Sequence, residues 1–111
     1  MALAPNPRPR HAAFTFAAVG SADATFQDAK GAQRLDVQFV GSGNFEASLF
    51  ASNDPAYAEG SLIDVTSALF GHATITSFGF YESNGNFTPE HLRVQVTSLQ
   101  AAHTIKAFAG F

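Results

Sequence analysis

Residues 91–99 read HLRVQVTSL, and in this stretch three aliphatic residues alternate with arginine, glutamine and threonine. A period of two is the pattern of a β-strand that buries one of its faces. The same alternation recurs in four more segments, residues 35–39, 45–51, 75–81 and 105–111. A further pair of aromatics, Phe14 and Phe16, falls on one face of an extended segment near the start. The sequence therefore predicts an all-β protein.

Turn-forming residues separate these segments. Gly41-Ser42-Gly43-Asn44 and Asn84-Gly85 are typical of tight hairpins, because glycine and asparagine tolerate positive φ angles. A longer loop is expected from Ser52 to about Gly60. Residues 61–70 fit either helical or strand spacing, and their β-branched side chains favour a strand or short turn. Six to eight short antiparallel strands in a β-sandwich or jelly roll are the predicted architecture.

The chain is long enough for one small domain, since it has 111 residues. Residues 1–12 are expected to form an extended arm, and residues 13–111 a single sandwich. Three prolines at alternate positions (Pro5, Pro7 and Pro9) favour extended backbone in the arm. Arg8 and Arg10 make it basic, which leaves residues 11–111 with 4 basic and 9 acidic side chains. The arm is either a loose terminus or a segment that orders against an acidic neighbouring subunit.

Catalytic, metal and nucleic-acid signatures do not stand out in the sequence. Its 4 histidines have no metal-ligand spacing, and the absence of cysteine excludes thiolate zinc sites and disulfides. Asp54, Glu59 and Asp64 surround one loop, but they lack a calcium-loop pattern and fit solvated loop charges better. No nucleophile or phosphate-loop motif is present, and no basic patch or long apolar run points to nucleic acid or a membrane. We therefore expect no cofactor, no metal and no enzymatic activity.

The aromatic residues suggest a contact surface. Most of the 12 phenylalanines are needed for the core. Phe78 and Phe80, however, share a strand face opposite to Ile75 and Tyr81, and Phe50 lies opposite to Leu49. Apolar side chains on both faces of a strand indicate that something besides the second sheet covers one face. Phe50, Phe78 and Phe80 are thus predicted interface residues, together with Pro5, Pro7, Arg8, Pro9 and Arg10 of the arm.

The central and C-terminal segments resemble small β-sandwich modules of tailed-bacteriophage virions. The likeness rests on the loop Ser52-Asn53-Asp54 after an alternating strand, and on Arg93-Val94-Gln95-Val96-Thr97-Ser98 in a late strand. Two departures are Pro55, where the modules usually have glycine, and Tyr57, where an aromatic residue, often tryptophan, is expected.

This resemblance implies a structural protein of the virion, assembled in the host cytoplasm. A capsid decoration (cement) protein is the first form of that role, and a neck or tail accessory protein the second. The implied partners are the major capsid protein or tail and neck proteins, together with further copies of the same chain.

A carbohydrate-binding sandwich is the alternative. Such a module needs aromatic platforms with polar partners beside them. Tyr57, Tyr81, Asn84 and Phe87 are the candidate ligand-binding residues for this function. The absence of tryptophan weighs against it, because sugar platforms favour large flat rings.

Overall fold

The structure, a computed structural model, describes residues 11–26 and 34–111. Within them it contains β1 (His11–Phe16), β2 (Gly20–Thr25), β3 (Asp36–Gly41), β4 (Phe45–Ser52), β5 (Ile63–Asp64), β6 (Gly79–Glu82), β7 (His91–Leu99) and β8 (Ile105–Gly110). A 3-10 turn, η1 (Glu59–Ser61), and one short helix, α1 (Thr66–Phe70), lie between β4 and β6. The prediction of an all-β protein is confirmed.

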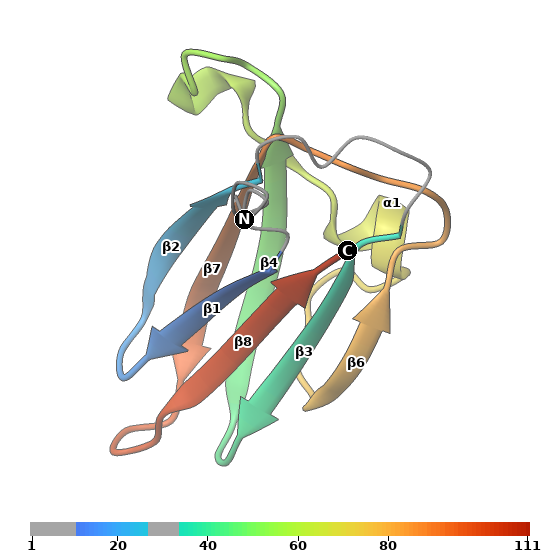
Figure 1. Ribbon diagram of the computed structural model, residues 1–111. Helices are drawn as coiled ribbons and strands as arrows, with labels where there is room; N and C mark the ends of the chain where they lie inside the picture. The colour runs from blue at the N-terminus through green and yellow to red at the C-terminus, as the bar shows by residue number, and fades with distance from the viewer. Residues whose placement is uncertain (1–10, 27–33) are drawn as a thin grey trace, which may run out of the picture.

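The strands form two four-stranded antiparallel sheets. Sheet A has the order β1-β8-β3-β6 and sheet B the order β2-β7-β4-β5. Figure 1 shows sheet A in front of β2, β7 and β4, with the chain passing repeatedly from one sheet to the other. This alternation, with the first strand β1 at the edge of sheet A beside the last strand β8, is the strand arrangement of a jelly roll.

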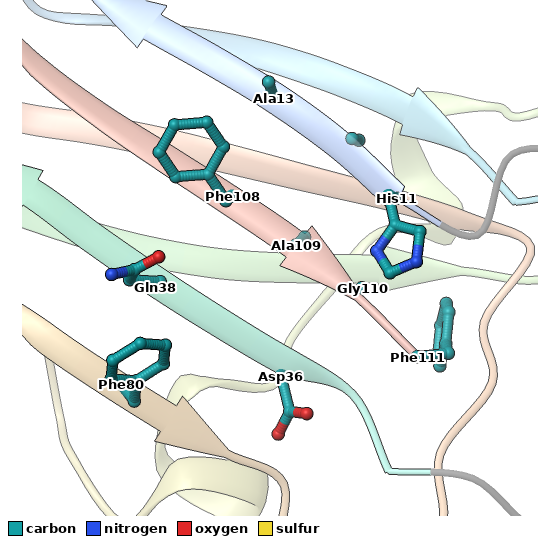
Figure 2. Close-up of a pocket in the computed structure, with 10 residues that line it drawn as sticks. His11, Ala13, Asp36, Gln38, Phe80, Phe108, Ala109, Gly110 and Phe111 are labelled. Carbon is teal, nitrogen blue, oxygen red and sulfur yellow. The ribbon is translucent and has the colours of Figure 1, made fainter.

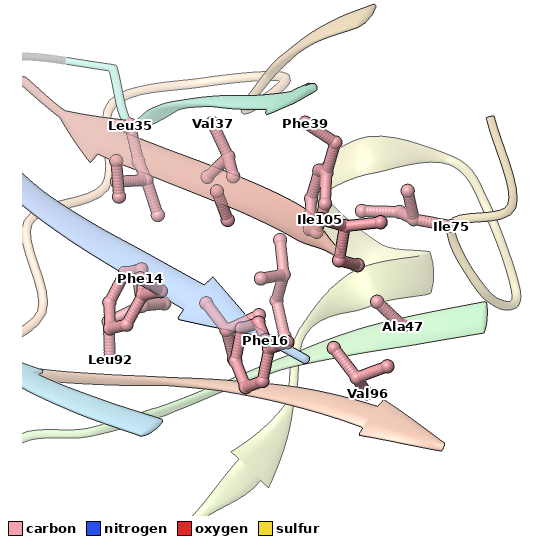
Figure 3. Packing of buried hydrophobic residues seen from close by; sticks show 14 of the residues in the cluster. Phe14, Phe16, Leu35, Val37, Phe39, Ala47, Ile75, Leu92, Val96 and Ile105 are labelled. Carbon is pink, nitrogen blue, oxygen red and sulfur yellow. The ribbon is translucent and has the colours of Figure 1, made fainter. Parts of the chain in front are cut away.

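The alternating segments place their apolar side chains between the sheets. On β7, Val94 is fully buried, whereas its neighbours Arg93 and Gln95 face outwards. Figure 3 shows aromatic and aliphatic side chains from both sheets meeting in this layer. Phe39 stacks on Phe45 with ring centres 5.5 Å apart, which joins sheet A to sheet B at one end of the core.

Neither predicted hairpin forms. The Gly41–Asn44 turn joins β3 in sheet A to β4 in sheet B, and the Asn84-Gly85 turn follows β6, which pairs with β3 and not with β7. Both segments are therefore crossovers between sheets. Gly43 has φ +86°, and a Cβ atom there would lie 2.6 Å from the ring of His103. Such glycines fix the local backbone, but the partner of each strand is set by packing across the whole core.

Three boundaries also differ from the expectations. Residues 61–70, expected to form a strand or short turn, contain the two-residue β5 followed by α1, and Gly71 with φ +73° caps the end of this helix. The segment 75–81 is a strand only from Gly79, while Ile75 makes an isolated bridge to Ala47 of sheet B. Strand β1 begins at His11, so residues 11 and 12 belong to the sheet and not to the arm.

Candidate functional site

The solvent-facing side of sheet A carries an aromatic row. The strand register places Phe80 of β6 beside Gln38 of β3, Gln38 beside Phe108 of β8, and Phe108 beside Ala13 of β1. Phe80 is 79% exposed and Phe108 41% exposed, which is unusual for large apolar side chains. Since one strand separates them, their backbones are about 9.5 Å apart.

A polar row borders the aromatic one. It runs from Glu82 through Asp36 and Gly110 to His11, two residues away from the aromatic row on each strand. Arg34 donates a hydrogen bond to Glu82 at 2.8 Å, and both side chains are more than half exposed. The two rows together combine exposed rings with acidic side chains on one sheet face.

Apart from Glu82, the residues of these rows line a shallow groove of about 440 Å³, which we call the sheet A groove. Figure 2 shows Phe108, Gln38 and Phe80 on three neighbouring strands, with Asp36, His11 and Phe111 toward one end. Alternation explains how it forms, because Val37 and Phe39 turn inwards on β3 and leave Asp36 and Gln38 outside. An open groove with two exposed rings is suited to holding an apolar surface or an extended segment.

The predicted interface residues lie in different parts of the structure. Phe80 lies in the sheet A groove, as a contact role requires. Phe78 is partly buried and stacks on Phe45 at 4.7 Å, so it packs against the protein's own core. Phe50 faces outwards on sheet B, where it lines a small depression with Leu62, Glu59 and Arg93. The arm residues Pro5, Pro7, Arg8, Pro9 and Arg10 lie outside the described residues.

Sequence reasoning missed Phe108. The alternation of residues 105–111 does put it opposite to Ile105, Ala107 and Ala109, which are buried. What the sequence lacks is the order of strands, which brings β8 next to β3 and within two strands of β6.

A second cluster of polar residues lies on the outside of sheet B. Arg93 donates from Nε to Asp23 at 2.6 Å, and from its two terminal nitrogens to Glu59 at 2.8 Å each. These bonds from the guanidinium lower the pKa of Asp23 and of Glu59 below their ordinary values. The same carboxylates, Glu59 most of all, raise the pKa of Arg93.

Tyr57 completes this cluster. Its hydroxyl donates to Asp23 at 2.7 Å. Desolvation, followed by the bond to Asp23, raises the pKa of Tyr57 to about 12. The ring stacks on His91, whose Nδ1 lies 3.0 Å from Thr25 Oγ1. Tyr57 also has φ +50°, a left-handed conformation uncommon for a residue other than glycine.

The cluster therefore fastens the loop after β4 to the outside of sheet B. The guanidinium already serves two carboxylates, so it does not present a free cation to an anionic ligand. Asp54 and Asp64 are engaged locally: Asp54 accepts from the backbone N–H of Ala56 and Ala58, and Asp64 from that of Thr66. Within residues 11–26 and 34–111, no three histidine or acidic side chains gather as metal ligands would.

The candidate carbohydrate-binding residues occupy separate places. Tyr57 packs on sheet B, and Tyr81 turns toward Phe39, with its ring edge-on at 6.0 Å. Asn84 holds α1 through bonds to the backbone oxygens of Ala68 and Leu69. Phe87 packs on the core near β5. These four side chains do not form one platform.

No helix in the described part of the chain has the length and apolar character to span a membrane. No family model, curated protein sequence or solved structure matches this chain.

Proposed function

We propose that the protein is a non-enzymatic assembly protein that docks onto other protein subunits through the sheet A groove. The exposure of Phe80 and Phe108 in one row is the observation that carries this proposal. Two phenyl rings in water are unfavourable by roughly 25 cal/mol for each Å² of apolar surface. A partner that covers them recovers this free energy.

A role in the virion is the specific form of the proposal. Decoration of a capsid shell comes first, and a neck or tail position second. Support for it comes from the resemblance at Ser52-Asn53-Asp54 and at residues 93–98. The jelly-roll architecture is compatible with it, but the same architecture also occurs in lectins and enzymes.

The test is incorporation into particles. Phage particles are produced in host cells that express this chain and are purified on a density gradient. Mass spectrometry then measures the ratio of the chain to the major shell protein. We expect the wild-type chain to sediment with particles at a fixed ratio, and Phe80→Ser to lower that ratio at least about tenfold, the effect of 1.4 kcal/mol of lost contact.

Ile63→Ser is the matched control, because Ile63 is 63% exposed but belongs to β5 in sheet B. This variant should be incorporated normally. Absence of the chain from every particle fraction would overturn the virion role. Equal incorporation of Phe80→Ser and wild type would overturn docking through the sheet A groove.

A further inference from the structure

We infer that the sheet A groove of one copy receives the basic proline-rich segment, residues 1–10, of a second copy. This inference rests on the proposed function and names the partner at that site.

The chemistry of the groove fits a proline-rich occupant. Prolines at alternate positions restrict their neighbours as well as themselves to extended conformations, so Pro5 to Pro9 loses little entropy on binding. Extended proline-rich segments bind in grooves lined by aromatic rings, against which the pyrrolidine rings pack. Phe80 and Phe108 provide two such rings about 9.5 Å apart, and the five residues from Pro5 to Pro9 span about 12 Å in this conformation.

Charge supports the same occupant. The segment carries Arg8 and Arg10 and has no acidic side chain, while the remaining chain has 4 basic and 9 acidic ones. Asp36 and Glu82 stand beside the aromatic row, and of the two Glu82 already accepts a hydrogen bond from Arg34. Asp36 is therefore the carboxylate that an arginine next to a proline bound on Phe80 would pair with. Exposed pairs of this kind add modest affinity, but they select the orientation of the segment.

The direction of β1 favours a second copy over the same chain. His11 pairs with Gly110, and Ala13 with Phe108, so the aromatic row lies ahead of His11 along β1. To fill the groove of its own copy, the segment before His11 would have to fold back over β1, whereas the segment of a neighbouring copy reaches the groove without that turn. Ten residues reach about 31 Å, enough to cross to an adjacent molecule.

The experiment uses full-length chains in a complementation test. The segment variant carries Arg8→Glu and Arg10→Glu, the groove variant Phe80→Ser and Phe108→Ser, and the control variant Ile63→Ser. Self-association is measured by analytical ultracentrifugation over a concentration series. Mixtures of the ¹⁵N-labelled segment variant with the unlabelled groove variant are examined by native mass spectrometry, which separates heterodimers from homodimers.

We expect the wild type and the control to self-associate. The segment variant and the groove variant, each measured alone, should have a dissociation constant for self-association that is at least about tenfold higher. Mixing the two variants should restore heterodimers, because the groove variant still has an intact segment and the segment variant an intact groove. Circular dichroism of each variant checks that the fold is retained, and Asp36→Asn provides a milder groove variant with the same expected direction.

The other outcomes separate the two proposals. Association of the segment variant at wild-type strength, with loss only in the groove variant, overturns the segment but leaves docking through the groove standing. Failure of the mixture to form heterodimers overturns exchange between copies. A wild-type chain that stays monomeric at all concentrations also overturns the inference, and the particle measurement then decides the proposed function independently.

Discussion

The phenol ring of Tyr57 lies nearly parallel to the imidazole ring of His91, with ring centres 4.1 Å apart and planes 17° apart. The stack joins the loop after β4 to the first residue of β7. Together with the Arg93 cluster, it makes a folded loop part of the outer surface of sheet B.

Removal of the Tyr57 hydroxyl isolates one bond of the cluster. Tyr57→Phe keeps the ring on His91 but loses the bond to Asp23, and we expect the free energy of unfolding to fall by about 1 kcal/mol. Tyr57→Ala loses the stack as well and should destabilise the protein more. Urea denaturation followed by circular dichroism measures both. Equal effects of the two variants would show that the stack contributes nothing.

Neutralising Arg93 tests the shared guanidinium. Arg93→Met keeps most of the aliphatic stem but leaves Asp23 and Glu59 close together without a cation, and we expect the free energy of unfolding to fall. A double-mutant cycle with Asp23→Asn gives the coupling free energy of the pair. The coupling should shrink in 1 M salt, since both carboxylates are partly exposed. A coupling free energy near zero at low salt would show that the pair of Arg93 and Asp23 does not stabilise the fold.

The lowered pKa values of Asp23 and Glu59 predict a loss of stability in acid. A carboxyl whose pKa is lower in the folded state stabilises the fold above its unfolded pKa. That contribution disappears as the pH falls from about 4 through the lowered value. In Arg93→Met, this part of the loss of stability at acid pH should be absent. Urea midpoints measured at closely spaced pH values compare the two proteins.

Tyr57 predicts a matching loss in alkali. Its pKa is raised from 10.0 to about 12, so the folded state holds this proton more tightly than the unfolded chain. The resulting stability is complete below pH 10 and is lost as the pH rises toward 12. Tyr57→Phe provides the comparison, because it removes the titrating group. An identical loss of stability between pH 10 and pH 12 in this variant and in the wild type would contradict the raised pKa of Tyr57.

Thr66 tests a buried side-chain bond in the wall of the core. Its hydroxyl accepts from the backbone N–H of Leu49 at 2.8 Å, and the side chain has no exposed surface. Thr66→Val conserves the shape but leaves that N–H without its partner, which costs about 1–3 kcal/mol. Thr66→Ser keeps the hydroxyl and loses only a methyl group, about 1 kcal/mol. In thermal denaturation, Thr66→Ser should have a higher midpoint temperature than Thr66→Val.

Two phenylalanines of sheet A should respond in opposite ways. Phe39 has no exposed surface, and Phe39→Ala is expected to cost about 3–5 kcal/mol through the cavity it leaves. Phe80→Ser should change the free energy of unfolding by no more than about 0.5 kcal/mol, because Phe80 is already in water. Calorimetry on both variants checks this contrast. A large loss for Phe80→Ser would mean that the ring supports the fold and not a contact.

Much of the strand content was predictable, because alternation reports directly which residues face the core. Phe14, Val37, Leu49 and Val94 are all buried on the faces that the period of two assigns to them. Strand β2 escaped prediction because its small side chains, GSADAT, give almost no hydrophobic contrast. The short helix α1 escaped because a five-residue segment is held by tertiary bonds such as that of Asn84 to Ala68, and not by its own propensity.

The site was less predictable than the fold. Phe80 could be assigned to an outer face from its own strand alone, but its neighbour Phe108 depends on strand order, which no local pattern encodes. Likewise, Asp23, Tyr57, Glu59 and Arg93 are far apart in sequence and meet only because β2 and β7 pair and the loop folds across them. Contacts of high sequence separation need the three-dimensional structure.

The pairing of His11 with Gly110 at one end of the β1–β8 ladder has a mechanical consequence. A pulling force applied to those two residues acts across the ladder at its end, so the hydrogen bonds break one after another and not all at once. Such a pair opens like a zipper at low force, whereas shear along the strands would load every bond together. Tension therefore separates β1 from β8 more easily when it acts at His11 and Gly110 than when it acts along the two strands.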